Sequence, residues 1–128
     1  MDVTNVEQLW GTWRLVETTS AVLKEGCLAY TEDGYVFAFA SAPLERRPGG
    51  VDPEALSPAQ ALACIKTGWG YCGTYELNSP WLRHHILHGT FPSWVGRDAM
   101  SRRHARLEGG LLILSGDNTT LKWQRTSS

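Results

Sequence analysis

The sequence predicts an all-β protein, a single domain in which eight antiparallel strands close into a barrel. A chain of 128 residues suits one domain with one core. Eight short segments are rich in strand-forming residues, and most are joined by short turns, which connect antiparallel neighbours. Six Trp, four Tyr and three Phe accompany thirteen Gly, a mixture that suits a curved sheet around a filled interior. Such a barrel has room inside for side chains or one small ligand.

The first third of the chain predicts a helical turn followed by three strands. Thr4-Asn5-Val6-Glu7 has the pattern of a capping box, which would open a short helical turn that carries Leu9 and Trp10. Alternating and β-branched residues then predict strands, and Glu32-Asp33-Gly34 predicts a tight turn between the second and third. The three strands are expected at residues 12–18, 27–31 and 35–40.

Residues 41–67 differ in kind from the flanking segments and predict an insert between strands three and four. Residues 41–58 contain four of the six prolines together with Gly49-Gly50, which predicts a loop. Ser57-Pro58-Ala59-Gln60 combines an N-cap, a proline at the first helical position and a capping box, so a helix is expected to about Thr67. The insert is either a lid or a packing segment.

Five further strands are expected after Gly68, and Gly109-Gly110 and Gly116-Asp117-Asn118 predict two of the turns between them. One segment, residues 79–89, is ambiguous. Ser79 could cap a helix with Pro80 at its first position and Gly89 at its end, so local signals leave helix and strand equally open. The expected strands are residues 69–77, 82–90, 102–107, 111–115 and 119–125.

Composition excludes several classes of function. A net charge of −1 gives no electrostatic reason to expect nucleic acid or an anionic membrane as a partner. The N-terminus lacks the pattern of a signal peptide, and no apolar run is long enough to span a membrane. Three cysteines without a C-x-x-C pair indicate reduced thiols, so a cytoplasmic protein is expected. Neither a nucleotide-binding glycine loop nor a G-x-S-x-G motif is present, and no cofactor is expected.

Several stretches, taken in order, resemble the bacterial and fungal lipocalin-like domain family. They include Gly11-Thr12-Trp13 and Pro92-Ser93-Trp94-Val95-Gly96, and they cover most of the chain except residues 41–66. The first of these motifs lies within the matching stretch 9–16, and the chain also matches at residues 28–35, 71–75 and 121–125 and at Arg103. Together with the local signals for the helical turn and the inserted helix, the resemblance predicts an eight-stranded antiparallel lipocalin-like barrel with a short N-terminal helical turn and one helix inserted between strands three and four.

The resemblance also implies roles for single residues. Residues 79–89 should form a strand with His84 pointing inward, and Arg103 occupies the matching position on the sixth strand. Trp13 should plug the closed end of the barrel, with Arg125 from the last strand lying across its ring. Because strands alternate in direction, the insert leaves from the opposite, open end. We therefore expect residues 41–67 to cover that end as a lid.

The two-residue period of strands then defines a largely apolar interior with a few polar groups. His84, His88, Tyr75 and Arg103 are the candidates for catalysis. In the alternative interpretation, the interior is a filled core in which Glu17 and Arg103 form a structural pair. The candidate ligand-binding residues are Leu15, Glu17, Phe37, Phe39, Trp69, Tyr71 and Ile86.

The histidines do not predict a metal site. His84 and His88 would lie together on a helix, but on a strand their Cα atoms are roughly 13 Å apart, at about 3.3 Å per residue. One metal ion cannot bridge that distance, and no metal is expected.

Two functions are consistent with such an interior. The first is cofactor-free cyclisation or isomerisation of a small hydrophobic metabolite in natural-product metabolism. His84 or His88 would move a proton, and Tyr71, Tyr75 or Arg103 would stabilise an enolate-like oxygen. The second is a non-catalytic binding or carrier protein. A structural or protein-interaction module is the third alternative. The identity of the ligand stays open, as does the choice between monomer and homodimer.

Overall fold

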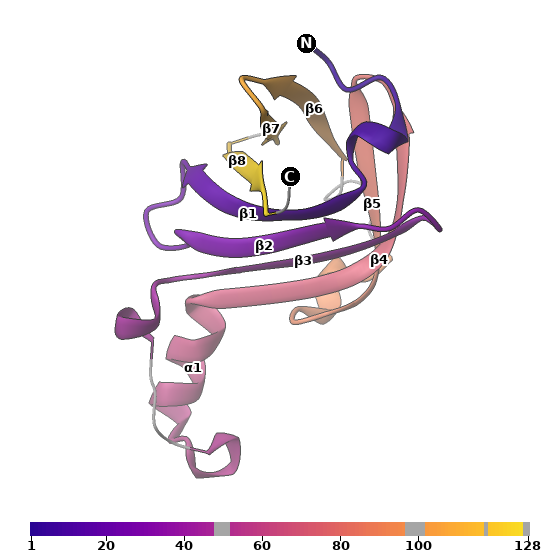
Figure 1. The fold of residues 1–128 in the computed structure, drawn as a ribbon. Coiled ribbons are helices and arrows are strands. Elements are labelled where there is room, and N and C mark those ends of the chain that lie inside the picture. The colour runs from indigo at the N-terminus through magenta and orange to yellow at the C-terminus, as the bar shows by residue number, and fades with distance from the viewer. Residues whose placement is uncertain (48–51, 97–101, 117, 127–128) are drawn as a thin grey trace.

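The computed structural model describes residues 1–47, 52–96, 102–116 and 118–126, and it shows one closed antiparallel barrel. Each strand pairs with the next along the chain, and β1 pairs with β8 to close the barrel (Figure 1). The predicted fold is confirmed, and residues 81–89 form a strand. Pro48, Gly49, Gly50 and Asp117, which the predicted loop and turn include, lie outside the described residues. The strands are β1 (Gly11–Thr18), β2 (Glu25–Tyr30), β3 (Tyr35–Ser41), β4 (Gly68–Asn78), β5 (Trp81–Gly89), β6 (Arg102–Glu108), β7 (Leu111–Ser115) and β8 (Thr120–Arg125).

Two capping boxes begin the short helices. The helix α1 (Pro58–Lys66) has Ser57 as its N-cap and Gln60 as the reciprocal partner, as the sequence predicts. The 3₁₀ turn η1 (Val6–Gln8) uses Asn5 and Gln8, one residue later than the predicted box, because the Asn5 carboxamide accepts the backbone N–H of Glu7. The other 3₁₀ turns are η2 (Leu44–Arg46), η3 (Pro53–Ala55) and η4 (Pro92–Trp94).

The core fills the closed half of the barrel interior. Along much of β1, β3 and β5, its inward side chains alternate with more exposed ones, as the two-residue period requires. Val3 and Leu9 from the N-terminal segment complete it from one end. The largest fully buried side chains are Trp13, Trp123, Tyr30, Leu9, Leu82, Leu112 and His84.

Two bulges interrupt this alternation. On β1, Val16 is an extra residue, because Leu15 pairs with Trp123 and Glu17 already pairs with Lys122, the next residue back along β8. On β5, Leu87 is an extra residue opposite the Cys72–Gly73 step of β4. Every side chain beyond a bulge changes face.

Among the residues that the structure describes, the pairing of β5 with β6 is short. Their register covers only Trp81 to Arg83 on β5 and Arg102 to His104 on β6, whereas β5 pairs with β4 along almost its whole length. The turn η4 follows β5, and the Gly96 N–H donates to the Ile86 carbonyl at 3.2 Å.

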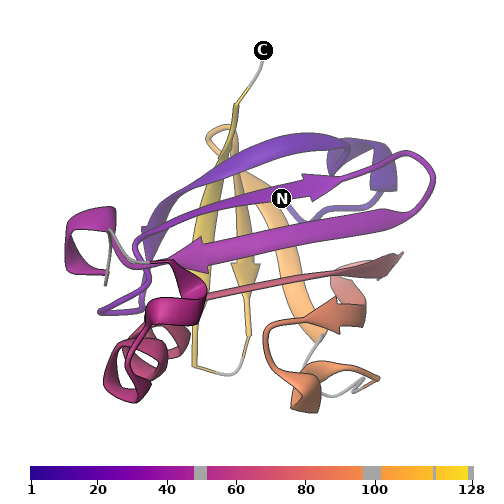
Figure 2. The ribbon, with the colours of Figure 1, turned by 90° about the horizontal axis from the view of Figure 1, so that it is seen from below.

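The insert leaves and rejoins the barrel at one place. The Ala42 N–H donates to the Thr67 carbonyl at 2.8 Å, and the Arg47 guanidinium donates to Thr67 Oγ1 and to the Cys64 carbonyl, both at 3.2 Å. From this base, α1 projects away from the barrel beyond the end of β3 and the start of β4 (Figures 1 and 2). Leu62 and Ile65 on α1 are about half exposed.

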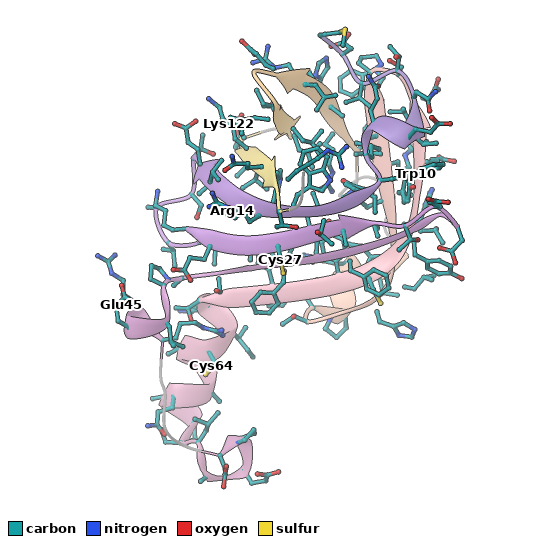
Figure 3. The ribbon with its side chains drawn as sticks, in the orientation of Figure 1. Trp10, Arg14, Cys27, Glu45, Cys64 and Lys122 are labelled. Atoms are coloured by element: carbon teal, nitrogen blue, oxygen red, sulfur yellow. The ribbon has the colours of Figure 1, made fainter. Side chains whose placement is uncertain are left out.

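All three cysteines are free thiols. Figure 3 shows Cys27 on the barrel wall and Cys64 on the separate helix α1. In the described part of the chain, no helix has the length and apolar character needed to cross a membrane.

Candidate ligand cavity

A cavity of about 1120 Å³ opens at the end of the barrel opposite η1. Its inner wall is apolar, and its size is sufficient for a small organic molecule. Ser20 and Leu23 from the β1–β2 connection and Gly116 and Thr119 beside the β7–β8 turn form part of its edge. The inner wall consists of Ala40, Trp69, Tyr71, Ile86, Trp94, Leu114 and Leu121.

Aromatic rings form one side of this cavity. Trp69 stacks on Tyr71 with ring centroids 5.5 Å apart and planes 14° from parallel. Trp94 on η4 meets Trp69 edge-on at 5.5 Å and Phe91 at 4.8 Å. Because β4 presents both Trp69 and Tyr71 to the interior, the neighbouring inward positions on β3 are small: Ala40 pairs with Trp69 and Ala38 with Tyr71.

Below the cavity, a buried histidine bridges two tyrosines. The His84 side chain is fully buried. Its Nε2 lies 2.8 Å from the Tyr30 hydroxyl and its Nδ1 lies 2.6 Å from the Tyr71 hydroxyl. Arg103 Nη1 also donates to the Tyr71 hydroxyl, at 3.5 Å. Tyr71 thus links the cavity to this buried network.

Burial decides the protonation of the network. Desolvation, reinforced by the positive charge of Arg103, holds the pKa of His84 well below its ordinary value, so the ring is neutral at neutral pH. Desolvation likewise raises the pKa of Tyr30 well above its ordinary value, so Tyr30 keeps its proton.

The tautomer of His84 follows from the same burial. A buried hydroxyl donor without an acceptor is costly. Among the described residues, His84 Nε2 is the one acceptor within hydrogen-bond distance of the Tyr30 hydroxyl, so Tyr30 donates to Nε2. The proton of the neutral ring then lies on Nδ1 and is donated to the Tyr71 oxygen. The hydroxyl proton of Tyr71 is left for an acceptor in the cavity.

Tyr75 lies outside this network. Its hydroxyl donates to the Thr31 carbonyl at 2.7 Å and accepts from Trp10 Nε1 at 3.1 Å. Tyr75 does not line the cavity, and burial raises its pKa. It fastens the segment that follows η1, where Figure 3 labels Trp10, to the β2–β3 turn. The ring of Tyr75 faces the interior as predicted, with its centroid 4.9 Å from that of Tyr30, but its hydroxyl is engaged away from the cavity, so the structure does not support the predicted catalytic role.

Two polar candidates point away from the interior because of the bulges. After Val16, Glu17 faces solvent, where its carboxylate pairs with Lys122 Nζ at 2.7 Å rather than with Arg103. After Leu87, His88 is exposed and pairs with the outward Cys72. The interior positions predicted for Glu17 and His88 are wrong, since an unbroken alternation was assumed on both strands.

The predicted face of β3 is also wrong. Phe37 and Phe39 are 49% and 42% exposed on the outer wall, and Val36, Ala38 and Ala40 point inward. Phe39 covers Gly70 on the neighbouring strand so closely that a Cβ there would lie 2.9 Å from the Phe39 ring. An aromatic ring packed over a strand glycine is a recognised means of stabilising a sheet from outside.

The remaining candidates face the interior. Trp69, Tyr71, Ile86 and Arg103 line the cavity. Leu15 and His84 are buried beneath it. Trp94 and Tyr30 were not among the predicted site residues. The Pro92-Ser93-Trp94 stretch was a signal for Trp94, but nothing in the local sequence distinguishes Tyr30 from an ordinary core residue.

The closed end matches the expectation drawn from the resemblance. The Arg125 guanidinium carbon lies 4.2 Å from the centroid of the Trp13 ring. Arg125 also donates to the backbone carbonyls of Gln8 (2.7 Å) and Trp10, and Trp13 Nε1 donates to the Leu9 carbonyl at 2.9 Å.

The insert does not form the expected lid. Within the part of the chain that the structure describes, no residue from 42 to 67 lines the cavity. The physical reason is the weak apolar face of α1, which has no buried residue. The helix leads into β4 and projects away from the barrel. Among the described residues, no group of three His, Cys, Asp or Glu side chains gathers into a metal-binding set.

A barrel plugged at one end and hollow at the other defines a class of small proteins built around an interior cavity. The sequence profile of the lipocalin-like domain family matches residues 10–128, and the chain belongs to this family. No curated protein is significantly similar to it.

Solved structures from two Bacteroides species are among those that match this chain. A lipocalin-like protein from Bacteroides uniformis superposes with a TM-score of 0.53 at 14% identity, covering 92% of this chain and 98% of the other. An uncharacterized protein from Bacteroides eggerthii gives a TM-score of 0.49 at 12% identity, covering 91% and 98% of the two chains.

Proposed function

We propose that the protein binds a small, largely apolar molecule in the cavity and that Tyr71 and Arg103 hold an oxygen atom of that molecule. The observation that carries this proposal is the Tyr30–His84–Tyr71 chain of hydrogen bonds, with distances of 2.8 and 2.6 Å. It uses both nitrogens of His84 and leaves the Tyr71 proton for an acceptor above it. Apolar walls with a few orienting polar groups are typical of sites for small molecules.

A matched pair of probes tests the proposal. Benzophenone and diphenylmethane have similar shapes, but only benzophenone carries a carbonyl oxygen. We expect both to bind in the cavity and benzophenone to bind about tenfold more tightly, the effect of roughly 1.4 kcal/mol from one hydrogen bond. Binding is measured by calorimetry and by quenching of tryptophan fluorescence.

The variants assign the effect to a residue. Tyr71→Phe should remove the preference for benzophenone, and the matched Tyr75→Phe should keep it, because Tyr75 contacts Thr31 and Trp10 instead of the cavity. Binding of neither probe would contradict the cavity as a ligand site. Equal affinities in the unmodified protein would contradict the role of Tyr71.

Cofactor-free isomerisation or cyclisation of the bound molecule is the second candidate function. It is favoured by the convergence of Tyr71 and Arg103, which would together stabilise negative charge developing on a carbonyl oxygen. The raised pKa of Tyr30 and the lowered pKa of His84 disfavour full proton transfer along the chain. The network therefore suits hydrogen-bond donation, and it favours binding over turnover.

Proton exchange separates the two functions. An apolar ketone with acidic α-hydrogens, such as 2-tetralone, is incubated with the protein in D₂O, and loss of the α-proton signals is followed by NMR. Exchange that is faster with the unmodified protein than with Tyr71→Phe would support catalysis through an enolate. Equal rates would leave binding as the function.

A further inference from the structure

The cavity extends beyond the barrel interior to a group of side chains on the outer face of β5 and β6. Trp81, Arg83 and Arg102, here called the rim cluster, occupy outward positions that alternate with the inward Leu82 and Arg103. They nevertheless line the same cavity as Tyr71 and Ile86. The rim cluster lies at the last described pair of the β5–β6 register, Arg83 with Arg102.

The rim cluster concentrates positive charge in a protein whose net charge is −1. Arg83 and Arg102 are direct cross-strand partners, and like charges in that position repel each other. Arg102 lies over the Trp81 ring with its guanidinium carbon 3.8 Å from the centroid, which fixes one face of the guanidinium and leaves its N–H edge open to a ligand.

Two acidic residues on neighbouring segments of the chain are engaged elsewhere. Glu76, the cross-strand partner of Arg83 on β4, has its carboxylate 3.4 Å from His85 Nε2. Asp2 lies 3.3 Å from His104 Nε2. In the described ranges of the chain, no carboxylate is within 4 Å of the guanidinium nitrogens of Arg83 or Arg102.

We propose that the rim cluster binds an anionic group, a carboxylate or a phosphate, on the same ligand whose apolar body fills the cavity. This inference rests on the proposed binding function and narrows the ligand to an amphipathic anion. Two guanidinium groups can share the oxygens of one such group by charge-assisted hydrogen bonds, which removes their mutual repulsion. The neighbouring Trp81 supplies an apolar surface for the part of the ligand that leaves the barrel.

Four probes with one alkyl chain test the inference: decanoate, decyl phosphate, decanol and decylammonium. Each is titrated calorimetrically into the protein. We expect decanoate or decyl phosphate to bind on the order of tenfold more tightly than decanol, and decylammonium to bind most weakly. Added salt should weaken binding of the preferred anion and leave decanol unchanged. The comparison of the two anions identifies the head group that the rim cluster prefers.

Arginine variants locate the anion site. Arg83→Gln combined with Arg102→Gln should reduce the preference for the anion to about twofold or less, with the affinity for decanol unchanged. The control, Arg14→Gln, removes an exposed guanidinium on β1 that bonds Gln124 and is labelled in Figure 3. Arg14→Gln should keep the full preference.

The outcomes that overturn the inference differ from those that overturn the proposed function. If none of the probes binds, the cavity is not a ligand site. If decanol binds as tightly as both anions, the proposed function survives and the rim cluster has no role in binding. If the preference persists in the double variant and disappears in Arg103→Gln, the anion binds inside the barrel and the rim cluster is again excluded.

Discussion

The two ends of the barrel use tryptophan in opposite ways. At the closed end, Trp13 is 1% exposed, its indole N–H is bonded to the Leu9 carbonyl, and Arg125 covers its ring. At the open end, Trp69 and Trp94 are only partly buried and meet each other across the edge of a cavity. Packing at the first end is complete, so it supplies stability. At the open end the side chains do not fill the interior, which leaves space for a ligand.

Truncating one tryptophan at each end should separate stability from binding. Trp13→Ala is expected to lower the free energy of unfolding by about 3–5 kcal/mol, because the cavity it creates in the core cannot collapse fully. Trp94→Ala should cost clearly less, about 1 kcal/mol, since its partly exposed ring already borders empty space. Urea denaturation measures both. Equal losses at the two ends would contradict the comparison.

The pH dependence of stability should come from the buried network between the two ends. Because the pKa of His84 is lowered in the folded state, the unfolded chain binds the proton more readily below about pH 6.5, the ordinary value for histidine. The contribution is fully present above that pH and is lost as the pH falls toward the folded pKa. The expected slope is up to about 1.4 kcal/mol per pH unit.

Denaturation at a series of pH values checks this slope. His84→Gln should reduce the difference in bound protons between the unfolded and folded states by about one, and so flatten the slope, whatever its effect on overall stability. The exposed His88 serves as the control, and His88→Gln should keep the slope. A slope that is the same in His84→Gln as in the unmodified protein would contradict the assignment.

A smaller effect is expected where the backbone turns into the closed end. Gly11 has φ of +114°, and a Cβ there would lie 3.0 Å from Arg125 Nη1. Gly11→Ala should cost about 1–3 kcal/mol from backbone strain and displace Arg125 from Trp13. Gly34, with φ of +94° and open space around it, is the control, because Gly34→Ala reports strain alone. Tryptophan emission should change only in Gly11→Ala, and an unchanged spectrum there would show that Arg125 is not displaced.

Much of the fold could be predicted because its signals are local. Ser57, Pro58 and Gln60 define the start of α1 by chemistry confined to one turn. Strand-forming residues and turn signals identified seven of the eight strands, and the resemblance to a family decided that residues 79–89 form the other one. The Trp13–Arg125 contact joins the first and last strands, and only the resemblance to a family could indicate it in advance.

The candidate site was harder to predict because it depends on register. One extra residue, Val16 or Leu87, decides whether Glu17 or His88 faces the interior, and neither bulge has a clear local signal. The face of β3 depends on its neighbours. Phe37 and Phe39 have the greater hydrophobicity, but the rings of Trp69 and Tyr71 on β4 require small partners beside them.

The contacts of Arg47 at the base of the insert have a consequence for insertions into the chain. Arg47 reaches Thr67 and Cys64, and it packs on Gly68, where a Cβ would lie 2.8 Å from its guanidinium. Because the chain departs and returns through one small junction, length added between residues 47 and 57 affects the barrel only through loop closure. Each doubling of the loop costs about 0.6 kcal/mol. This appendage is therefore the place where the protein can accept foreign sequence, such as an epitope or a tethered second domain, while the barrel keeps its register.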